Sequence, residues 1–122
     1  MRFVIQQHIA KDEHFDLMVE IDGLDALLTW KIAKRDMDLL TKGDLVKAEK
    51  LPDHRKAYLA YEGPVNMGRG IVKIFDSGDC RTLLKEDNKL VFELEGNNLA
   101  GNIRLYCVDN ILFTIQYHPK QK

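Results

Sequence analysis

The chain has 122 residues and a mass of 14.1 kDa, which is enough for one hydrophobic core and too little for two domains, so we expect a single domain over residues 1–122. Its content of 45% hydrophobic and 30% charged residues excludes a disordered chain. No apolar run approaches the roughly 20 residues of a membrane helix, and no leader segment is visible, so we expect a cytoplasmic protein without membrane contact.

The net charge of −1 gives no general attraction for nucleic acid. Binding to a polyanion would depend on local clusters of basic residues, although most such residues are simply solvated. The candidates are Lys31, Lys34, Arg35, Lys47, Lys50, Arg55 and Lys56. The two cysteines, Cys80 and Cys107, form no CxxC pattern, so we expect small core residues in strands.

Residues 3–21, FVIQQHIAKDEHFDLMVEI, contain two of the four histidines and show the alternation of a β-hairpin. In an extended strand the side chains of His14, Asp16 and Met18 share one face, while the apolar residues between them point the other way. A short polar segment lets the chain turn back, so the preceding strand places His8 beside His14 and Asp16.

Two imidazoles and a carboxylate are a common ligand set for manganese, zinc or iron, and they leave positions open for water and a substrate oxygen. The pattern alone is weak, because polar residues on the solvated face of a half-buried hairpin would give the same alternation. From the spacing of these three residues, both interpretations remain open.

The rest of the chain alternates short strand patterns with Gly, Asn and Asp turns, which predicts an all-β fold, a small closed or nearly closed antiparallel barrel. Strands are expected at 24–32, 45–50, 53–63, 70–76, 80–85, 89–95, 99–108 and 111–117. Between them we expect a helical turn or loop at 35–44, a loop at 66–70, and turns at Pro52, 77–79, 87–88, 96–98 and 109–110.

Several blocks of the sequence occur together in an order that is typical of one family. FVIQQH, HFDLMVEIDG, TWKIAK and DHRKAYLAYEGP, with GNNLAG further on, resemble the 3′-phosphoesterase domain of bacterial DNA ligase D and its stand-alone relatives. Order and spacing agree over most of residues 1–63 and again at 96–101. Several blocks in register are more specific than any one of them, and the resemblance implies a barrel fold and phosphoesterase activity.

The resemblance also implies that His8, His14 and Asp16 are the metal ligands and that the ion is Mn²⁺, with Zn²⁺ or another divalent transition ion as an alternative. A mixed nitrogen and oxygen ligand set does not by itself choose among these ions. The chemistry suits the activity, because a divalent ion polarises a phosphoryl oxygen and lowers the pKa of bound water.

In the same family a histidine and, four residues later, a tyrosine contact the reacting phosphate, and these positions match His54 and Tyr58. The histidine serves as a general acid or stabilises the transition state, a role that suits an imidazole because it titrates near neutral pH. Gln6 and Lys34 match further phosphate-binding positions. The alternative for His54 is an exposed loop histidine beside Pro52.

The chain departs from the family pattern where the family has two arginines, which are replaced by Met18 and Val46. We expect Met18 to project into the rim of the metal site, where an arginine would restore a contact to phosphate. Lys47 and Lys50 lack the bidentate fork of a guanidinium. The glycine-rich loop after Gly63 is also about three residues shorter than in the family.

These observations favour a metal-dependent phosphoesterase that processes the 3′ ends of DNA or of ribonucleotide-tipped DNA in repair. We expect a monomer whose partners are nucleic-acid 3′ ends, with a DNA ligase or another end-joining protein as a further candidate. Two alternatives stay open: a weak or inactive homologue that binds nucleic-acid ends or a ligase, and a metal-binding barrel that acts on a small phosphate ester.

Overall fold

The structure is a computed structural model that describes residues 1–121, excepting the side chain of Asn66. The strands in this range are β1 (Arg2–Ile9), β2 (His14–Val19), β3 (Leu27–Ala33), β4 (Val46–His54), β5 (Gly63–Pro64), β6 (Ile71–Lys85), β7 (Lys89–Gly96), β8 (Ala100–Cys107) and β9 (Leu112–Pro119). The helical segments are α1 (Lys34–Thr41) and the 3₁₀ turns η1 (Lys56–Ala60) and η2 (Asn66–Gly68). Among residues 1–121, no helix has the length and apolar character needed to cross a bilayer.

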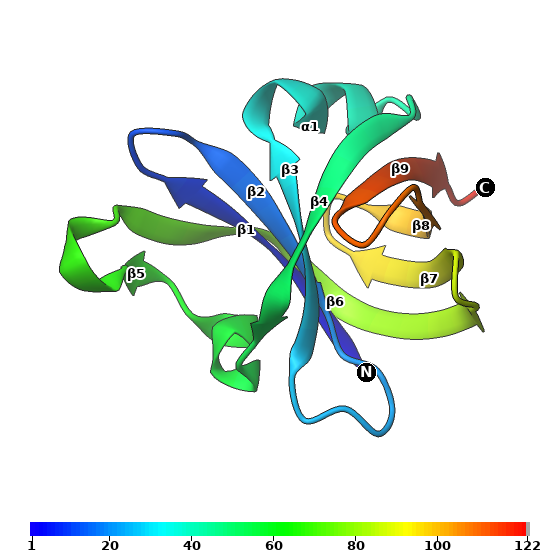
Figure 1. Ribbon diagram of the computed structural model, residues 1–122, viewed down its shortest axis with the longest axis horizontal. Helices are drawn as coiled ribbons and strands as arrows, with labels where there is room; N and C mark the ends of the chain where they lie inside the picture. The colour runs from blue at the N-terminus through cyan, green and yellow to red at the C-terminus, as the bar shows by residue number, and fades with distance from the viewer. Residues whose placement is uncertain (122) are drawn as a thin grey trace.

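The strands form one antiparallel sheet that closes on itself (Figure 1). The order is β1-β2-β3-β4-β9-β8-β7-β6, and β6 returns to pair with β1, which gives a barrel of eight strands within the described range. The two-residue strand β5 pairs with β6 beside the barrel. The predicted all-β barrel is therefore confirmed, and its closure pairs edges that an open sheet would expose.

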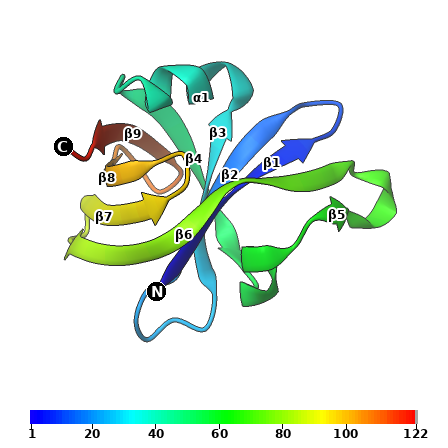
Figure 2. The same cartoon turned by 180° about the vertical axis from the view of Figure 1, so that it is seen from behind.

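β6 is a long strand that pairs with both β1 and β7 and continues through residues 77–79, so the turn predicted there is wrong. Its first part pairs with β1 and its second part with β7, and Figure 2 shows it running unbroken from one side of the barrel to the other. Gly78 explains the misleading pattern, because a Cβ at this position would lie 1.9 Å from the carbonyl oxygen of Glu95. The glycine marks a close approach of two backbones and not a turn.

β4 also runs further than expected, through Pro52 to His54, so the predicted turn at Pro52 and the predicted strand at 53–63 are both wrong. Pro52 is tolerated because the register of β3 and β4 shifts at this point and creates a bulge, where a residue without a backbone N–H costs little. After β4 the chain forms η1, in place of an extended strand.

The barrel interior is filled by alternate residues of the strands, with Trp30, Phe3 and Phe92 among the largest fully buried side chains. The helical turn predicted over 35–44 is α1, which lies at one end of the barrel (Figure 1). Met37 and Leu40 of α1 are buried and belong to this core. At about 25 cal/mol per Å² of apolar surface, burial of this kind is the main stabilising term of the fold.

Both cysteines lie in strands, as expected, but only Cys80 belongs to the core, so the prediction of a core residue is wrong for Cys107. Cys80 in β6 is 5% exposed, and burial raises the pKa of its thiol to about 12. Cys107 in β8 is partly buried, and its Sγ lies 2.9 Å from the carbonyl oxygen of Asp109. The two thiols should therefore differ in reactivity, because the thiolate is the reactive form.

Candidate metal centre

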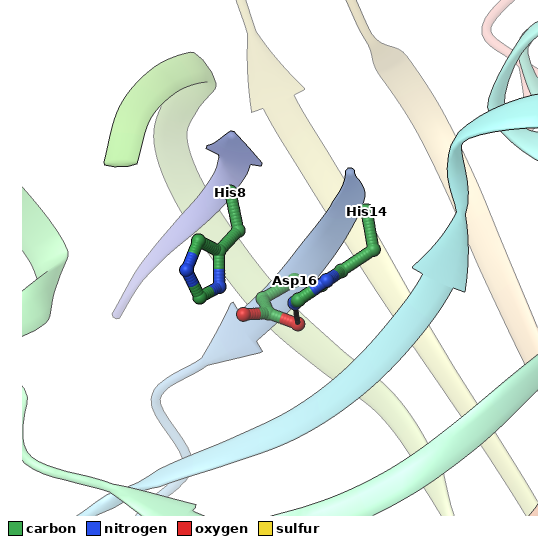
Figure 3. A group of neighbouring side chains, drawn as sticks. All are labelled: His8, His14 and Asp16. Atoms are coloured by element: carbon green, nitrogen blue, oxygen red, sulfur yellow. Dashed lines mark ion pairs between the residues drawn. The ribbon is translucent and has the colours of Figure 1, made fainter. Parts of the chain in front are cut away.

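The hairpin of β1 and β2 brings the two histidines of the first block side by side. In the register of this pair His8 lies opposite His14, and Gln6 lies opposite Asp16. The intervening residues of β2 fill the barrel core, so these side chains stand on the outer face of the wall. Figure 3 shows the two imidazoles and the carboxylate gathered where β1 ends and β2 begins.

The donor atoms of His8, His14 and Asp16 all lie within 4.8 Å of one another. His14 Nε2 is 3.3 Å from Asp16 Oδ1, and the two imidazole rings meet edge to face with their centroids 4.7 Å apart. When two donor atoms each lie about 2.1 Å from a metal ion, the angle at the ion sets their separation. They are about 3.0 Å apart at a right angle, about 3.4 Å at a tetrahedral angle and about 4.2 Å on opposite sides of the ion. His14 Nε2 and Asp16 Oδ1 already have this spacing. A donor pair 4.8 Å apart needs only a small side-chain rotation to reach the same range.

Two buried atoms of this group have no hydrogen-bond partner among residues 1–121, namely His14 Nδ1 and Asp16 Oδ1. Asp16 is only 5% exposed, and its contact with the His14 ring is an ion pair only when that ring is charged. A buried polar atom without a partner costs about 1–3 kcal/mol. A divalent cation bound through His14 Nε2 would satisfy Asp16 Oδ1, so the donor set fits a transition ion.

The orientation of His8 is set by the loop before β6. Its Nε2 lies 2.7 Å from the carbonyl oxygen of Arg69, and because a carbonyl only accepts, Nε2 carries the proton and Nδ1 keeps the lone pair. Gly70 permits this contact, because it has φ of +94° and a Cβ there would lie 2.2 Å from the carbonyl oxygen of Ile9. The glycine thus lets the loop pack against the end of β1 and bind the His8 ring.

His54 and Tyr58 lie together at the end of β4 and in η1, outside the group of three. His54 Nδ1 donates to the carbonyl oxygen of Pro52 at 2.9 Å, which leaves Nε2 as the nitrogen available to a ligand. The His54 and Tyr58 rings meet edge to face with centroids 5.7 Å apart. The buried Gln6 amide donates to the carbonyl oxygens of Tyr58 and Tyr61 at 3.2 and 3.0 Å, which ties this segment to the strand beside Asp16.

Lys34, at the start of α1, has a partner within the protein. Its Nζ lies 3.1 Å from Glu13 Oε2, in the turn of the β1–β2 hairpin. Hydrogen bonds from Gln7 and Lys34 hold the pKa of the Glu13 carboxyl below its ordinary value. A phosphate contact by Lys34 or by Gln6 stays a prediction, because each side chain already has a protein partner in the structure.

The structure corrects the expectation for Met18, which does not reach the rim of the metal site. Met18 is fully buried in a small apolar cluster with Val4 and Leu27 on the outer wall of the barrel. The residues packed over this cluster are Tyr58, Leu59 and Ile74. Val46 is likewise buried, in the main core. At both positions where the sequence resemblance implies an arginine, this chain therefore has a buried apolar side chain.

A cavity of about 330 Å³ lies between η1 and the loop before β6. Its lining residues are Arg55, Ala57, Tyr58, Tyr61, Pro64, Val65 and Arg69. The three metal ligands do not line this cavity, but Arg69 links the two, because it lines the cavity and its carbonyl group binds His8. The sequence named Arg55 only as one of several basic residues that could bind a polyanion, and it predicted a loop at 66–70, so no pattern indicated that Arg55 and Arg69 share a cavity.

The fold and the site define a class of protein, a small antiparallel β-barrel with a group of two histidines and one aspartate on its outer wall. Comparison with known sequences gives the family, since the profile of the DNA ligase D 3′-phosphoesterase domain matches residues 6–106. This chain belongs to that family, as its sequence blocks predicted.

The relatives found by sequence comparison are much longer proteins. The multifunctional non-homologous end joining DNA repair protein LigD of Mycobacterium tuberculosis is 32% identical over 110 residues, which is 84% of this chain and 14% of that protein. The corresponding protein of Pseudomonas aeruginosa is 32% identical over 115 residues, which is 86% of this chain and 13% of that protein. The chain thus spans about one seventh of these relatives.

Proposed function

We propose that this chain is a metal-dependent phosphoesterase that removes groups from the 3′ ends of DNA, or of DNA ending in a ribonucleotide, before the ends are joined. The convergence of His8, His14 and Asp16 in a chain of this family is the observation that supports the proposal. Mn²⁺ is the proposed ion, with Zn²⁺ as the alternative. Because the relatives are end-joining proteins, a DNA ligase or another end-joining protein is the proposed partner.

When bound, a divalent ion would polarise a phosphoryl oxygen and lower the pKa of water. The protein supplies the three donors and orients them. His8 offers Nδ1, since its Nε2 is bound to the Arg69 carbonyl group, while Asp16 contributes a negative charge that balances the cation. Partners of this kind around a ligand fix its tautomer and typically contribute 10–100-fold to metal affinity or activity.

His54 is the proposed proton donor. Its Nδ1–H is bound to the Pro52 carbonyl group, so Nε2 is the atom that holds the transferable proton when the ring is charged. It gives this proton to the leaving oxygen as the bond between phosphorus and that oxygen breaks. Tyr58, in edge contact with the His54 ring, is the neighbouring group proposed to bind phosphate.

The test is incubation of the purified protein with Mn²⁺ and two duplexes, one with a 3′-phosphate and one with a 3′-terminal ribonucleotide, with analysis of the end products by mass spectrometry. Removal of the terminal group is expected, with loss of activity in EDTA and in Asp16→Ala. His118→Ala is the matched control, because His118 lies on β9 and contacts Gln116. If the folded protein yields no product with Mn²⁺ or Zn²⁺, the proposed activity is wrong.

One observation favours a second candidate, a homologue that binds 3′ ends without processing them. Met18 and Val46 are buried apolar residues where the family has arginines, so two cations that would stabilise a phosphoryl transition state are lost. This candidate predicts measurable affinity for a 3′-phosphorylated duplex with no product after prolonged incubation. The same experiment separates the two, if binding is recorded beside product formation.

A further inference from the structure

Two arginines of the cavity have no ionic partner among residues 1–121. Arg55 and Arg69 line the cavity, and neither forms an ion pair within this range. The described lining also contains no carboxylate. A second cavity, beside α1, differs because its basic residues are mixed with Asp36 and Glu49. Two unpaired cations on one concave surface create a positive potential, which attracts an anion.

Each arginine is positioned by a different contact. The guanidinium carbon of Arg55 lies 5.8 Å from the centroid of the Tyr58 ring, a cation–π contact that keeps the charge at the cavity wall. Arg69 is positioned through its main chain, because its carbonyl group binds the ring of His8. Within residues 1–121, its guanidinium forms one hydrogen bond, to the sulfur of Met67, a weak acceptor, at 4.0 Å. The guanidinium of Arg69 can therefore turn toward a ligand.

We infer that Arg55 and Arg69 form a phosphate-binding subsite that receives the terminal nucleotide of a nucleic-acid strand. The inference rests on the proposed function. It names two arginines that supply the contact to phosphate that the buried, apolar Met18 and Val46 cannot make. A cavity of about 330 Å³ lies within the range of about 300–1,000 Å³ that is typical of small-molecule sites, which is enough for a nucleotide. Guanidinium groups suit this ligand, because they bind phosphate oxygens in pairs.

The position of the subsite follows from its links to the metal ligands. Arg69 is the residue whose carbonyl group orients His8, and Gln6, opposite Asp16 in the hairpin, is bound to the main chain of Tyr58 and Tyr61. The cavity that would hold the strand end is thus linked to the metal group through Arg69 and Gln6. The subsite selects a nucleic-acid end over a small phosphate ester, because a small ester fills only part of the cavity.

The experiment measures binding directly, by fluorescence anisotropy of labelled single-stranded oligonucleotides with a 3′-phosphate or a 3′-hydroxyl, at several salt concentrations in EDTA, so that the proposed activity does not remove the phosphate during the measurement. The variants are Arg55→Ala, Arg69→Ala and the double substitution. Arg81→Ala is the matched control, because this exposed arginine pairs with Glu93 on β7, across strands outside the site. Inorganic phosphate serves as the competing small ligand.

We expect each single substitution to weaken binding of the 3′-phosphorylated strand about tenfold, and the double substitution to weaken it more. The plot of log binding constant against log salt concentration should become less steep by about 0.7 for each arginine removed. The reason is that each phosphate contact releases counterions from a single strand. Arg69→Lys should bind with intermediate affinity, because lysine keeps the charge without the fork. Arg81→Ala should bind as the wild type does. Inorganic phosphate should compete only weakly with the strand.

The outcomes separate this inference from the proposed activity. If the wild type is active and the double variant, folded by circular dichroism, binds and cleaves as the wild type does, the subsite is wrong and the activity stands. If the wild type binds without forming product and the double variant loses binding, the subsite stands and the activity is wrong. A wild type that binds no strand, or whose double variant keeps the full salt dependence, overturns the inference.

Discussion

Replacement of Met18 by arginine introduces the guanidinium that the sequence resemblance implies at this position, but the structure predicts that it damages the protein. Met18 is fully buried between Val4 and Leu27, and η1 covers this cluster. An unpaired charge in such a place costs about 3–5 kcal/mol. That is a fifth or more of the stability of about 5–15 kcal/mol that is usual for a domain of this size.

The cost should be visible in thermal unfolding followed by circular dichroism. For a chain of this length, 1 kcal/mol moves Tm by about 3–5 °C, so Met18→Arg should lower Tm by roughly 10–20 °C. If the arginine escapes to solvent instead, it must displace η1, and with it Tyr58 from its place beside His54. Turnover should therefore fall in either case.

The matched control is Met18→Leu, which keeps an apolar side chain of similar volume and should cost less than about 1.5 kcal/mol. A Met18→Arg protein that unfolds at the wild-type Tm and has a higher kcat/KM would refute this reasoning. Such a result would mean that η1 moves aside at little cost and that position 18 opens to the substrate.

Four further outcomes follow from the structure. Mn²⁺ at 100 times its Kd should stabilise the wild type by about 2.7 kcal/mol, seen as a higher Tm, and this rise should vanish in His14→Ala; a rise that persists there would argue against the metal group. His54→Ala should lower turnover by about two to four orders of magnitude with the Mn²⁺-induced rise in Tm unchanged, whereas equal activity would leave His54 a structural residue. Gly78→Ala should lower the free energy of unfolding by about 1–3 kcal/mol, measured by denaturant titration, because its Cβ would overlap a carbonyl oxygen of β7; an unchanged free energy would show that the strands can separate freely. A maleimide should label only Cys107 in the native protein and Cys80 only after unfolding, so two labels on the native protein would contradict the burial of Cys80.

The sequence by itself determined the features that depend on neighbouring residues. The alternation along residues 14–19 assigns each side chain to a face, and the short polar turn before it fixes the register that places His8 opposite His14. The group of His8, His14 and Asp16 could thus be predicted, because a hairpin is a local structure. The turns at 87–88, 96–98 and 109–110 followed from the preferences of Gly, Asn and Asp for the same reason.

Other features depend on residues far apart in the chain, and only the tertiary structure decided them. Residues 53–63 alternate like a strand, yet Lys56–Ala60 within them form η1, because the outer wall of the barrel presents an apolar cluster that this segment covers. Gly78 has the appearance of a turn residue, yet it lies within a strand because β7 approaches it closely. Arg55 and Arg69 line one cavity although they belong to separate segments of the chain. No local sequence pattern indicates that these two segments come together. In each case a contact between distant parts of the chain overrides a local preference, since burial of apolar surface outweighs the small energies of local propensity.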